Sequence, residues 1–352
     1  MTISTIEELS TAVRDAKGSI VTVGAGTQQE FGNPLRSADS TINLDGLNRI
    51  TAYNPADLTV HVEAGVTLGR LQQTLAEHNQ MLPLDPWNGP DATIGGIVST
   101  NAQGPFRAMG TIRNWIIGMR LVHADGRMSK TGGRVVKNVT GYDLAKLYTG
   151  SLGSLAVIAE ISLKLKSRFG KTVTAIAEVD RAADSWSLVK EVRERGLQPV
   201  ACEIAGPKPS VWLRFGEHPR AVDWQVANLP KADWKIFEGE EEPLQWEALR
   251  KRYHEMGPIV LRVVGVPETL NASSSWIAHA WNGIVLMSAS SVEEIRAVRQ
   301  KFPAVIEKAP IDIRRQVPTF GVNGAELRLM KEMKRALDPQ GRLNPGRHID
   351  GE

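Results

Sequence analysis

Short alternations of apolar and polar residues dominate residues 1–170, and they predict β-strands separated by turns. The expected strands are 19–23, 59–63 and 161–166. Residues 115–123, followed by Asp125-Gly126, indicate a β-hairpin. Leucines at 68, 71 and 75 share one face of a helix over 67–78, for which Thr67 is the expected N-cap. This half of the chain therefore predicts an α+β domain.

From residue 171 the pattern changes to a plainer alternation of strands and helices. The expected strands are 173–179, 200–204, 211–215, 259–264 and 283–288, and the expected helices are 185–195, 244–255 and 291–301. Such an order favours an antiparallel sheet with helices on one face. A last helix over 325–337 ends at Asp338-Pro339. We expect three parts: a first domain over 1–170, a smaller α/β cap domain over 171–322, and a C-terminal helix and tail over 323–352.

Residues 83–110 break both patterns, because they carry five glycines and four prolines with no charged or long apolar run. Glycine and proline disfavour the interior of an ordinary helix or strand. Glycine also lets a backbone approach a ligand closely with its N–H groups exposed. We therefore expect this segment to be a loop moulded around a large polar cofactor.

Composition narrows the classes of function. The formal net charge is +3 and the basic residues are scattered, so a nucleic-acid partner is not expected. The N-terminus has no apolar core of a signal peptide, and no apolar run reaches the roughly 20 residues that span a bilayer. Cys202 is the single cysteine, which excludes a disulfide within the chain and an iron–sulfur cluster held by it alone. Redox chemistry in this chain would need an organic cofactor.

Three glycine-containing segments are candidates for holding that cofactor. Residues 23–29 follow a strand and begin G-x-G, but Gln29 stands at the third glycine position and Gly32 and Pro34 prevent a following helix. A nest of backbone N–H groups that binds phosphate and a plain tight turn both remain open for this loop. Residues 93–104 add hydroxyl and amide side chains suited to a pyrophosphate and a sugar, with a close-packed turn as the alternative. Residues 149–160 are a Gly-Ser turn that leads into a strand.

In this order the three segments resemble the FAD-binding domain shared by vanillyl-alcohol oxidase, para-cresol methylhydroxylase (PCMH) and the FAD-linked 2-hydroxyacid dehydrogenases. The resemblance recurs at residues 338–346, DPQGRLNPG, which are similar to the family's closing motif. Within the family, the GAGTQQEFG loop and LYTGSLGSLAVIAEISLKLK are similar to the smaller FAD-binding subunits of bacterial glycolate oxidases. The resemblance implies an α+β fold: a two-subdomain PCMH-type FAD-binding domain, then the cap domain with its antiparallel sheet and a C-terminal tail.

The resemblance also assigns cofactor contacts. It places Gly24, Ala25, Gly26, Thr27 and Gln28 in the first phosphate loop. It places Thr93, Gly95, Gly96, Ser99, Asn101 and Gly104 in the central segment, closed by Gly110. Gly150, Ser151, Gly153 and Ile158 flank the nucleotide, and Asn344 returns from the tail toward the flavin. The first loop has no histidine or cysteine where part of the family attaches its flavin, so we expect non-covalent FAD.

Catalytic residues are not assigned by the sequence. The histidine-rich H-x-G-D-G-N-x-H segment of full-length relatives is absent, and no two of the seven histidines have close ligand spacing, so no metal site is expected. Each histidine is expected to be a surface or packing residue, although folding could still assemble a cluster. A 2-hydroxy acid substrate would need a cation for its carboxylate. The candidates are Arg107, Arg113, Arg314 and Arg315, with a solvated surface role as the alternative.

The function implied by the resemblance is that of a FAD-binding subunit in a glycolate oxidase complex, which oxidises glycolate, and in one alternative D-lactate, to the 2-oxo acid. The implied partners are a larger catalytic FAD subunit and an iron–sulfur subunit. The implied location is the cytoplasm, or the inner membrane face if the complex docks there. Two other hypotheses remain open: a stand-alone FAD-dependent 2-hydroxyacid dehydrogenase, and a structural subunit whose FAD fold only shapes an interface.

Overall fold

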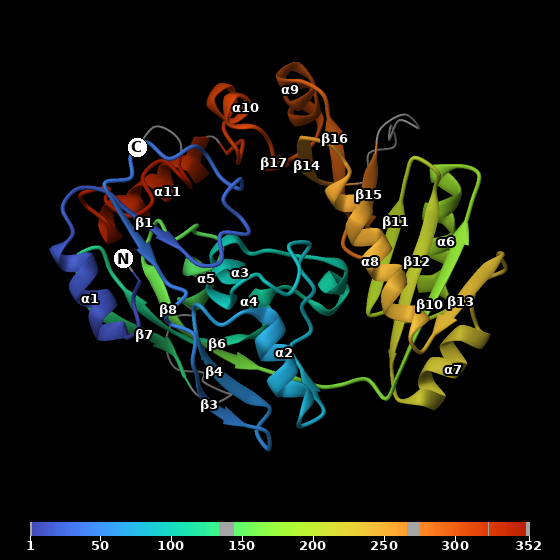
Figure 1. Ribbon diagram of the computed structural model, residues 1–352. Coiled ribbons are helices and arrows are strands. Elements are labelled where there is room, and N and C mark those ends of the chain that lie inside the picture. The colour runs from blue at the N-terminus through green and yellow to red at the C-terminus, as the bar shows by residue number, and fades with distance from the viewer. Residues whose placement is uncertain (1, 134–143, 266–274, 323, 350–352) are drawn as a thin grey trace. The chain divides into compact units, whose positions relative to one another are not determined.

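The structure is a computed structural model that describes residues 2–133, 144–265, 275–322 and 324–349. The chain separates into two compact units. Unit 1 comprises residues 1–104, 110–168 and 322–352, and unit 2 comprises residues 105–109 and 169–321. Each unit has its own sheets and its own apolar cores (Figure 1).

Unit 1 is built around an antiparallel sheet with strand order β3-β4-β8-β6-β7. Its strands are β3 (Ile50–Asn54), β4 (Thr59–Glu63), β6 (Ile116–Val122), β7 (Met128–Gly132) and β8 (Val157–Lys164). Helices α2 (Leu68–Ala76) and α3 (Ile94–Thr100) bury Leu71, Leu75 and Ile94 in the same core as Val60 and Val62 of β4. The predicted hairpin over 115–123 and its Asp125-Gly126 turn are confirmed by β6 and β7.

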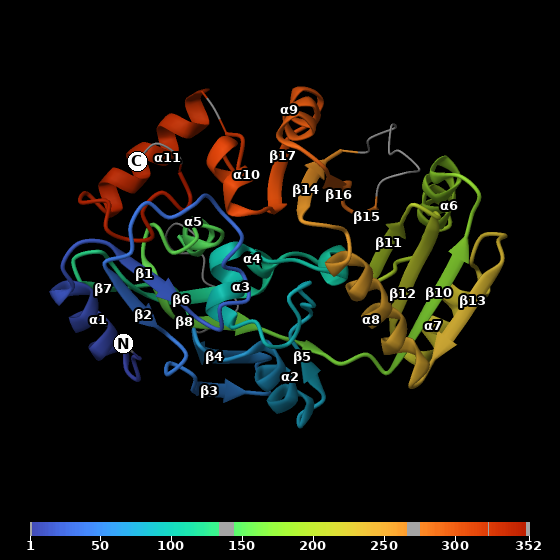
Figure 2. The same cartoon turned by 45° about the horizontal axis from the view of Figure 1, so that its top comes forward.

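In a second layer of unit 1, the N-terminal elements pack against the C-terminal tail. Strand β1 (Ile20–Val23) pairs in parallel with β2 (Ser40–Asn43), and Leu343 of the tail forms a parallel bridge with Ile20. Helix α1 (Ile6–Asp15) buries Leu9 and Val13 in the core that also holds Leu343. Figure 2 shows β1 and α1 in blue near α11 (Gly324–Leu337) in red. The remaining elements of this unit are β5 (Gln80–Met81), α4 (Ile112–Trp115), α5 (Ala145–Tyr148) and β9 (Lys166–Ser167).

Unit 2 contains an antiparallel sheet with strand order β13-β10-β12-β11-β15-β16-β14-β17. Its strands are β10 (Lys171–Glu178), β11 (Ala201–Ala205), β12 (Ser210–Glu217), β13 (Trp234–Glu238), β14 (Ile259–Val264), β15 (Trp276–His279), β16 (Ile284–Ala289) and β17 (Ala304–Lys308). Its helices are η1 (Pro105–Met109), α6 (Ala182–Glu194), α7 (Pro219–Ala227), α8 (Glu241–His254), α9 (Val292–Lys301) and α10 (Ile311–Gln316). The predicted antiparallel sheet is confirmed.

The prediction that helices cover one face of this sheet is wrong. Helices α6 and α7 bury Val192 and Val222 against the face that carries Val173. Helix α8 lies on the opposite face, where the Trp246 indole N–H donates to Thr174 Oγ1 at 2.8 Å (Figure 1). Side chains alternate along a strand, so Val173 and Thr174 must point to opposite faces. The sequence of α8 conceals this arrangement because its apolar residues do not gather on one stripe.

Candidate cofactor site

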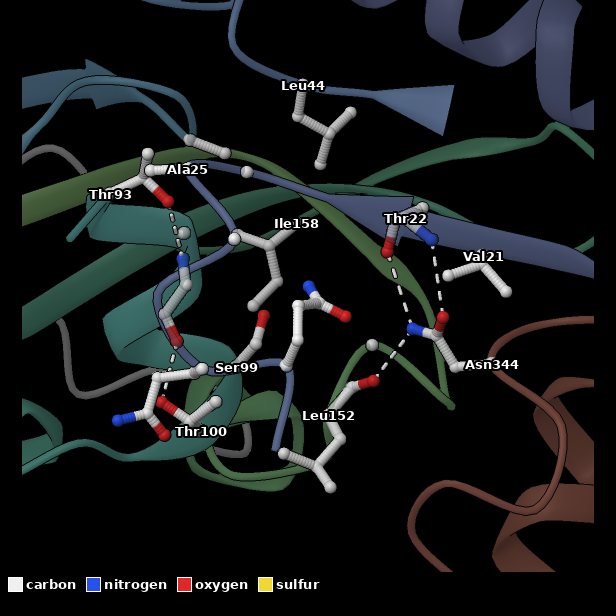
Figure 3. Close-up of a pocket in the computed structure, with 18 of the residues that line it drawn as sticks. Val21, Thr22, Ala25, Leu44, Thr93, Ser99, Thr100, Leu152, Ile158 and Asn344 are labelled. Atoms are coloured by element: carbon white, nitrogen blue, oxygen red, sulfur yellow. Dashed lines mark hydrogen bonds between the residues drawn. The ribbon is translucent and has the colours of Figure 1, made fainter. Parts of the chain in front are cut away.

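The end of β1, helix α3, the start of β8 and the tail surround a cleft in unit 1 (Figure 3). The cleft encloses about 810 Å³, including its open mouth. Three segments far apart in the sequence, residues 21–29, 93–100 and 152–158, meet here with residues 344 and 347. The cleft is therefore built by the fold and not by a single loop.

Helix α3 corrects the expectation that residues 83–110 form only a loop. Thr93 caps this helix, and its hydroxyl accepts a hydrogen bond from the Gly96 N–H at 3.2 Å. A Cβ on Gly95 would lie 2.6 Å from Ala64 Cβ and 2.8 Å from Ala64 O, so glycine is required for α3 to pack on the chain after β4. The cost of two glycines in a helix is thus offset by close packing and a cap.

Gly96 differs from Gly95 in the space that a side chain there would have. A Cβ on Gly96 would meet Thr93 Oγ1 at 3.0 Å and nothing else within 4 Å. Gly24 approaches the same hydroxyl, and a Cβ there would lie 2.5 Å from Thr93 Oγ1. Because Gly24 and Gly96 have no side chains, the backbone is exposed on the two walls of the cleft beside Thr93. A ligand can therefore approach the backbone closely there.

The first glycine loop is held in place by Asn88. The Asn88 Nδ2 donates to the Thr27 carbonyl at 2.7 Å, and the Gln28 amide also contacts Asn88 Oδ1. Gly26 has φ +75°, in the left-handed region that favours glycine. No helix follows this loop, as predicted from Gly32 and Pro34.

The tail closes the cleft through Asn344. Its Oδ1 accepts the Thr22 N–H at 3.2 Å, and its Nδ2 donates to the Leu152 carbonyl at 2.8 Å (Figure 3). The amide is thus engaged with the protein on both sides. Asn344 therefore positions β1 and the 152–153 turn, both of which line the cleft.

A buried ion pair supports the tail. Lys334 of α11 donates to Asp338 Oδ2 at 2.6 Å, to the Ser154 carbonyl at 2.8 Å and to the Leu343 carbonyl at 3.0 Å. Asp338 also accepts the N–H groups of Arg342 and Leu343 at 3.0 and 2.7 Å. Each buried charge therefore has its hydrogen-bonding partners, which such a pair needs to be stable. The D-P-x-G-x-L-N-P-G sequence is a scaffold that carries Asn344 to the cleft.

The structure brings most of the sequence-predicted residues to the cleft. Those that line it are Gly24, Ala25, Gly26, Thr27, Gln28, Thr93, Gly95, Gly96, Ser99, Gly153, Ile158 and Asn344. The others, which do not line it, are Asn101, Gly104, Gly110, Gly150 and Ser151.

Those five residues shape the surrounding backbone. Asn101 ends α3 in the left-handed region, and Gly104 passes Asp85 so closely that a Cβ would lie 1.8 Å from its carbonyl oxygen. Gly110 and Gly150 have φ of +112° and +82°, and the buried Ser151 hydroxyl donates to the Tyr148 carbonyl at 2.8 Å.

Comparison with known proteins assigns the fold and the cofactor. The model of the FAD binding domain matches residues 1–132, and that of the C-terminal domain of FAD linked oxidases matches residues 319–348. The glycolate oxidase subunit GlcD of Bacillus subtilis is 31% identical over 97% of this chain and 86% of its own length. This chain belongs to the FAD-linked oxidases. FAD is accordingly its cofactor.

A second relative and a solved structure are also similar to this chain. The glycolate oxidase subunit GlcE of Escherichia coli is 30% identical over 70% of this chain and 67% of its own length. The structure of p-cresol methylhydroxylase superposes with a TM-score of 0.74 at 16% identity, covering 99% of this chain and 88% of that one. The latter shows that the expected PCMH-type fold is correct.

The lining of the cleft fits FAD chemically. A flavin dinucleotide presents a charged pyrophosphate between two largely apolar ring systems, and the lining joins backbone amides and hydroxyls with Val21, Leu44 and Val157. Arg347 is the charged residue of the lining, and its guanidinium contacts the Gln29 carbonyl. Among the described residues, the lining includes no histidine, cysteine or tyrosine that could bond covalently to the flavin.

The lining also contains residues that the resemblance did not assign. Four of them lie within the three candidate segments: Gln29, Thr100, Leu152 and Val157. The others lie outside those segments and were missed by sequence reasoning: Val21, Thr22, Phe31, Leu35, Leu44, Ala64 and Arg347. Thr22 could have been found from its place in the strand that leads into the first glycine loop. Arg347 follows the closing motif directly, but no pattern in the sequence shows that the chain turns back there.

His348, beside the cleft residue Arg347, is half-buried. Burial, together with the charge of Lys334, lowers the pKa of His348 to about 4. The described residues contain no cluster of three or more potential metal ligands. In the part of the chain that the structure describes, no helix is both long and apolar enough to cross a membrane.

Proposed function

We propose that this chain is the FAD-binding subunit of a dehydrogenase complex that oxidises glycolate, with its FAD in the cleft of unit 1. The observation that carries the proposal is the glycine-walled cleft closed by Asn344, in a chain similar to glycolate oxidase subunits. D-lactate is the second substrate, because a D-lactate dehydrogenase of Arabidopsis thaliana is 30% identical over 98% of this chain. Either substrate is a small 2-hydroxy acid.

Different residues of the cleft would contact different parts of FAD. The N–H groups of residues 24–28 would bind the pyrophosphate beside Gly96, and Ser99 and Thr100 offer hydroxyls to a sugar. Val157 and Ile158 would pack against a ring system. Bound FAD supplies the two-electron oxidant for the hydride on Cα of the acid. The protein positions the cofactor and keeps it non-covalently bound.

The same chemistry implies partners. Oxidation of each substrate leaves two electrons on the flavin, and the single cysteine cannot hold a cluster that would carry them away. The names GlcE and GlcD belong to subunits of glycolate oxidase, so we propose a larger FAD subunit and an iron–sulfur subunit as partners of this chain. We further propose that the complex works in the cytoplasm, with docking at the inner membrane through its other subunits.

The test is to purify the chain alone and together with co-expressed partners. A bound flavin should give a visible spectrum, and anaerobic glycolate should bleach it in the complex. Bleaching of the isolated chain would instead establish a stand-alone dehydrogenase. A colourless chain that still assembles would identify a structural subunit and would overturn the proposal. Iron analysis of the complex tests the iron–sulfur partner.

A further inference from the structure

The unit 2 sheet ends at strand β13, and the outer side of this strand is an open edge. β13 pairs with β10 through residues 234–238, and among the described residues no strand pairs with its other side (Figure 2). Alternate residues of an edge strand turn their backbone N–H and C=O groups away from the sheet, where another strand can bind them. Proteins commonly protect such an edge with outward charges, a proline, a bulge or a covering segment.

The side chains of β13 give its edge little of this protection. Lys235 Nζ lies 3.7 Å from Glu178 of β10, and Glu238 lies 3.0 Å from Lys171 of the same strand. Both charges of β13 are therefore engaged with the neighbouring strand. Ile236, at the middle of β13, is 42% exposed, and the strand contains no proline. The centre of the edge is thus apolar and accessible.

Two more exposed apolar side chains lie close to this edge. Trp224 of α7 is 55% exposed and Leu244 of α8 is 61% exposed. Helix α7 meets the end of β13 through Lys171, whose Nζ lies 2.8 Å from Asp223 and 3.0 Å from Glu238. Helix α8 contacts β13 and follows it across a short turn. Exposed apolar side chains that gather in this way mark a surface for binding another protein.

Charge is unevenly distributed along the edge. Lys231 and Lys235 are exposed at its N-terminal end, with Asp233 between them. The C-terminal end is acidic, because Glu238, Glu240 and Glu241 are all exposed there. Two antiparallel copies of this edge place the acidic end of each beside the lysines of the other, whereas parallel copies place acid beside acid. The charge pattern therefore fits a second copy of the same strand in antiparallel orientation.

We propose that β13 pairs with β13 of a second copy of this chain, so that the unit 2 sheets of two copies join into one antiparallel sheet. The contact is isologous, with a two-fold axis perpendicular to the sheet. Such an axis keeps the faces of the sheet the same, so paired residues must have numbers of equal parity. A register centred on Ile236 uses the whole strand and places Lys235 opposite Phe237, where its ammonium can lie on the ring.

The proposed contact is modest in size. Its affinity comes from the main-chain hydrogen bonds of one strand pair, together with burial of Ile236 and the side chains around it. An interface of one short strand pair lies at the small end of specific protein contacts, so the dimer should dissociate on dilution. The pairing involves unit 2 alone and does not depend on which acid the complex oxidises.

The contact is tested by sedimentation velocity of the full chain over a range of concentrations. The wild type should pass from monomer to dimer as its concentration rises. Ile236→Lys places two like charges at the two-fold axis and should raise the dimer Kd at least about 10-fold. Leu329→Lys is the matched control, because Leu329 on α11 is 60% exposed and lies in unit 1. A wild type that stays monomeric, an unchanged Kd in Ile236→Lys, or an equal effect of Leu329→Lys overturns the proposal.

The antiparallel orientation is tested by exchanging charges. The double variant Glu240→Lys, Glu241→Lys should weaken the dimer, and adding Lys231→Glu to the same chain should bring the Kd back toward the wild-type value, because the two ends are then complementary again. If the third substitution weakens the dimer further, the strands do not run antiparallel and the proposal fails.

The register is tested by cross-linking. Ile236→Cys would face its own copy across the axis at a distance suited to a disulfide, and the native Cys202 is buried and does not compete. Mild oxidation should give a covalent dimer on a non-reducing gel, while Leu329→Cys should not. A dimer formed equally by both variants contradicts the register. If the chain alone is monomeric and Ile236→Lys instead releases a co-expressed subunit, that subunit occupies the edge and the second-copy proposal is overturned.

Discussion

Asn344 Nδ2 donates to the Leu152 carbonyl at 2.8 Å, across 192 residues of sequence. The bond joins the C-terminal motif to the Gly-Ser turn, and the same side chain accepts the Thr22 N–H from β1. Three segments that the sequence presents as separate motifs are thus fastened by one amide. The cleft keeps its shape because this amide is satisfied by protein on both sides.

Replacing Asn344 should loosen the cofactor. Asn344→Ala removes the bonds to Thr22 and Leu152 and places alanine at φ +41°, in the left-handed region. We expect FAD affinity to fall at least about 10-fold, since each bond contributes roughly 0.5–1.5 kcal/mol. Asn344→Gly separates the two causes, because glycine accepts this φ. If the glycine variant binds FAD as tightly as the wild type, backbone strain and not the amide is responsible.

Gly95 and Gly96 should respond differently to the same change. Gly95→Ala pushes a methyl group into the Ala64 backbone, so the variant should lose stability with or without FAD. Gly96→Ala meets only Thr93 Oγ1, so the stability of the apo protein should change by less than about 1 kcal/mol, because alanine favours the helix while the capping hydroxyl must shift slightly. Its methyl group would occupy the cleft, and flavin absorbance should be lost on gel filtration. Retention of FAD by Gly96→Ala would show that the pyrophosphate lies elsewhere.

The Lys334–Asp338 pair should dominate the stability of the tail. Lys334→Met leaves Asp338 charged and buried, which costs about 3–5 kcal/mol in comparable pairs. Urea unfolding measures this loss. Arg335→Met on the same helix is exposed and should change stability by less than about 0.5 kcal/mol. Equal effects of the two substitutions would mean that the pair does not hold the tail.

Local patterns predicted much of the fold. Thr67 caps α2 by accepting the Arg70 N–H, as the sequence indicated, and the helix expected over 291–301 is α9, capped by Ser291 through the Glu294 N–H. Strand β13 was missed because it is exposed at the edge of its sheet and has no apolar alternation to reveal it. Helix α3 was missed because its glycines argue against a helix until the contact with Ala64 is known. The Glu203–His279 pair, 76 residues apart, depends on strand register, which no local pattern encodes.

Whether the flavin is bound covalently can be tested directly. The lining within the described residues offers no histidine, cysteine or tyrosine, so acid precipitation should leave all yellow flavin in the supernatant. The pellet, digested with a protease and examined by mass spectrometry, should yield no flavin-bearing peptide. A flavinylated peptide would contradict non-covalent binding and would identify its attachment residue.

His348 should make the folded protein sensitive to acid. Its pKa is about 4 in the folded protein, against 6.5 for an ordinary histidine, so the unfolded chain binds the proton more tightly. Stability is therefore fully present above pH 6.5, falls by about 3 kcal/mol as the pH drops to 4, and is not further affected by this group below that. Urea unfolding at several pH values should show a shallower loss between pH 6.5 and 4 in His348→Gln. His78→Gln, at an exposed position, should follow the wild type. Parallel curves for His348→Gln and the wild type would show that His348 takes up its proton without opening the tail beside the cleft.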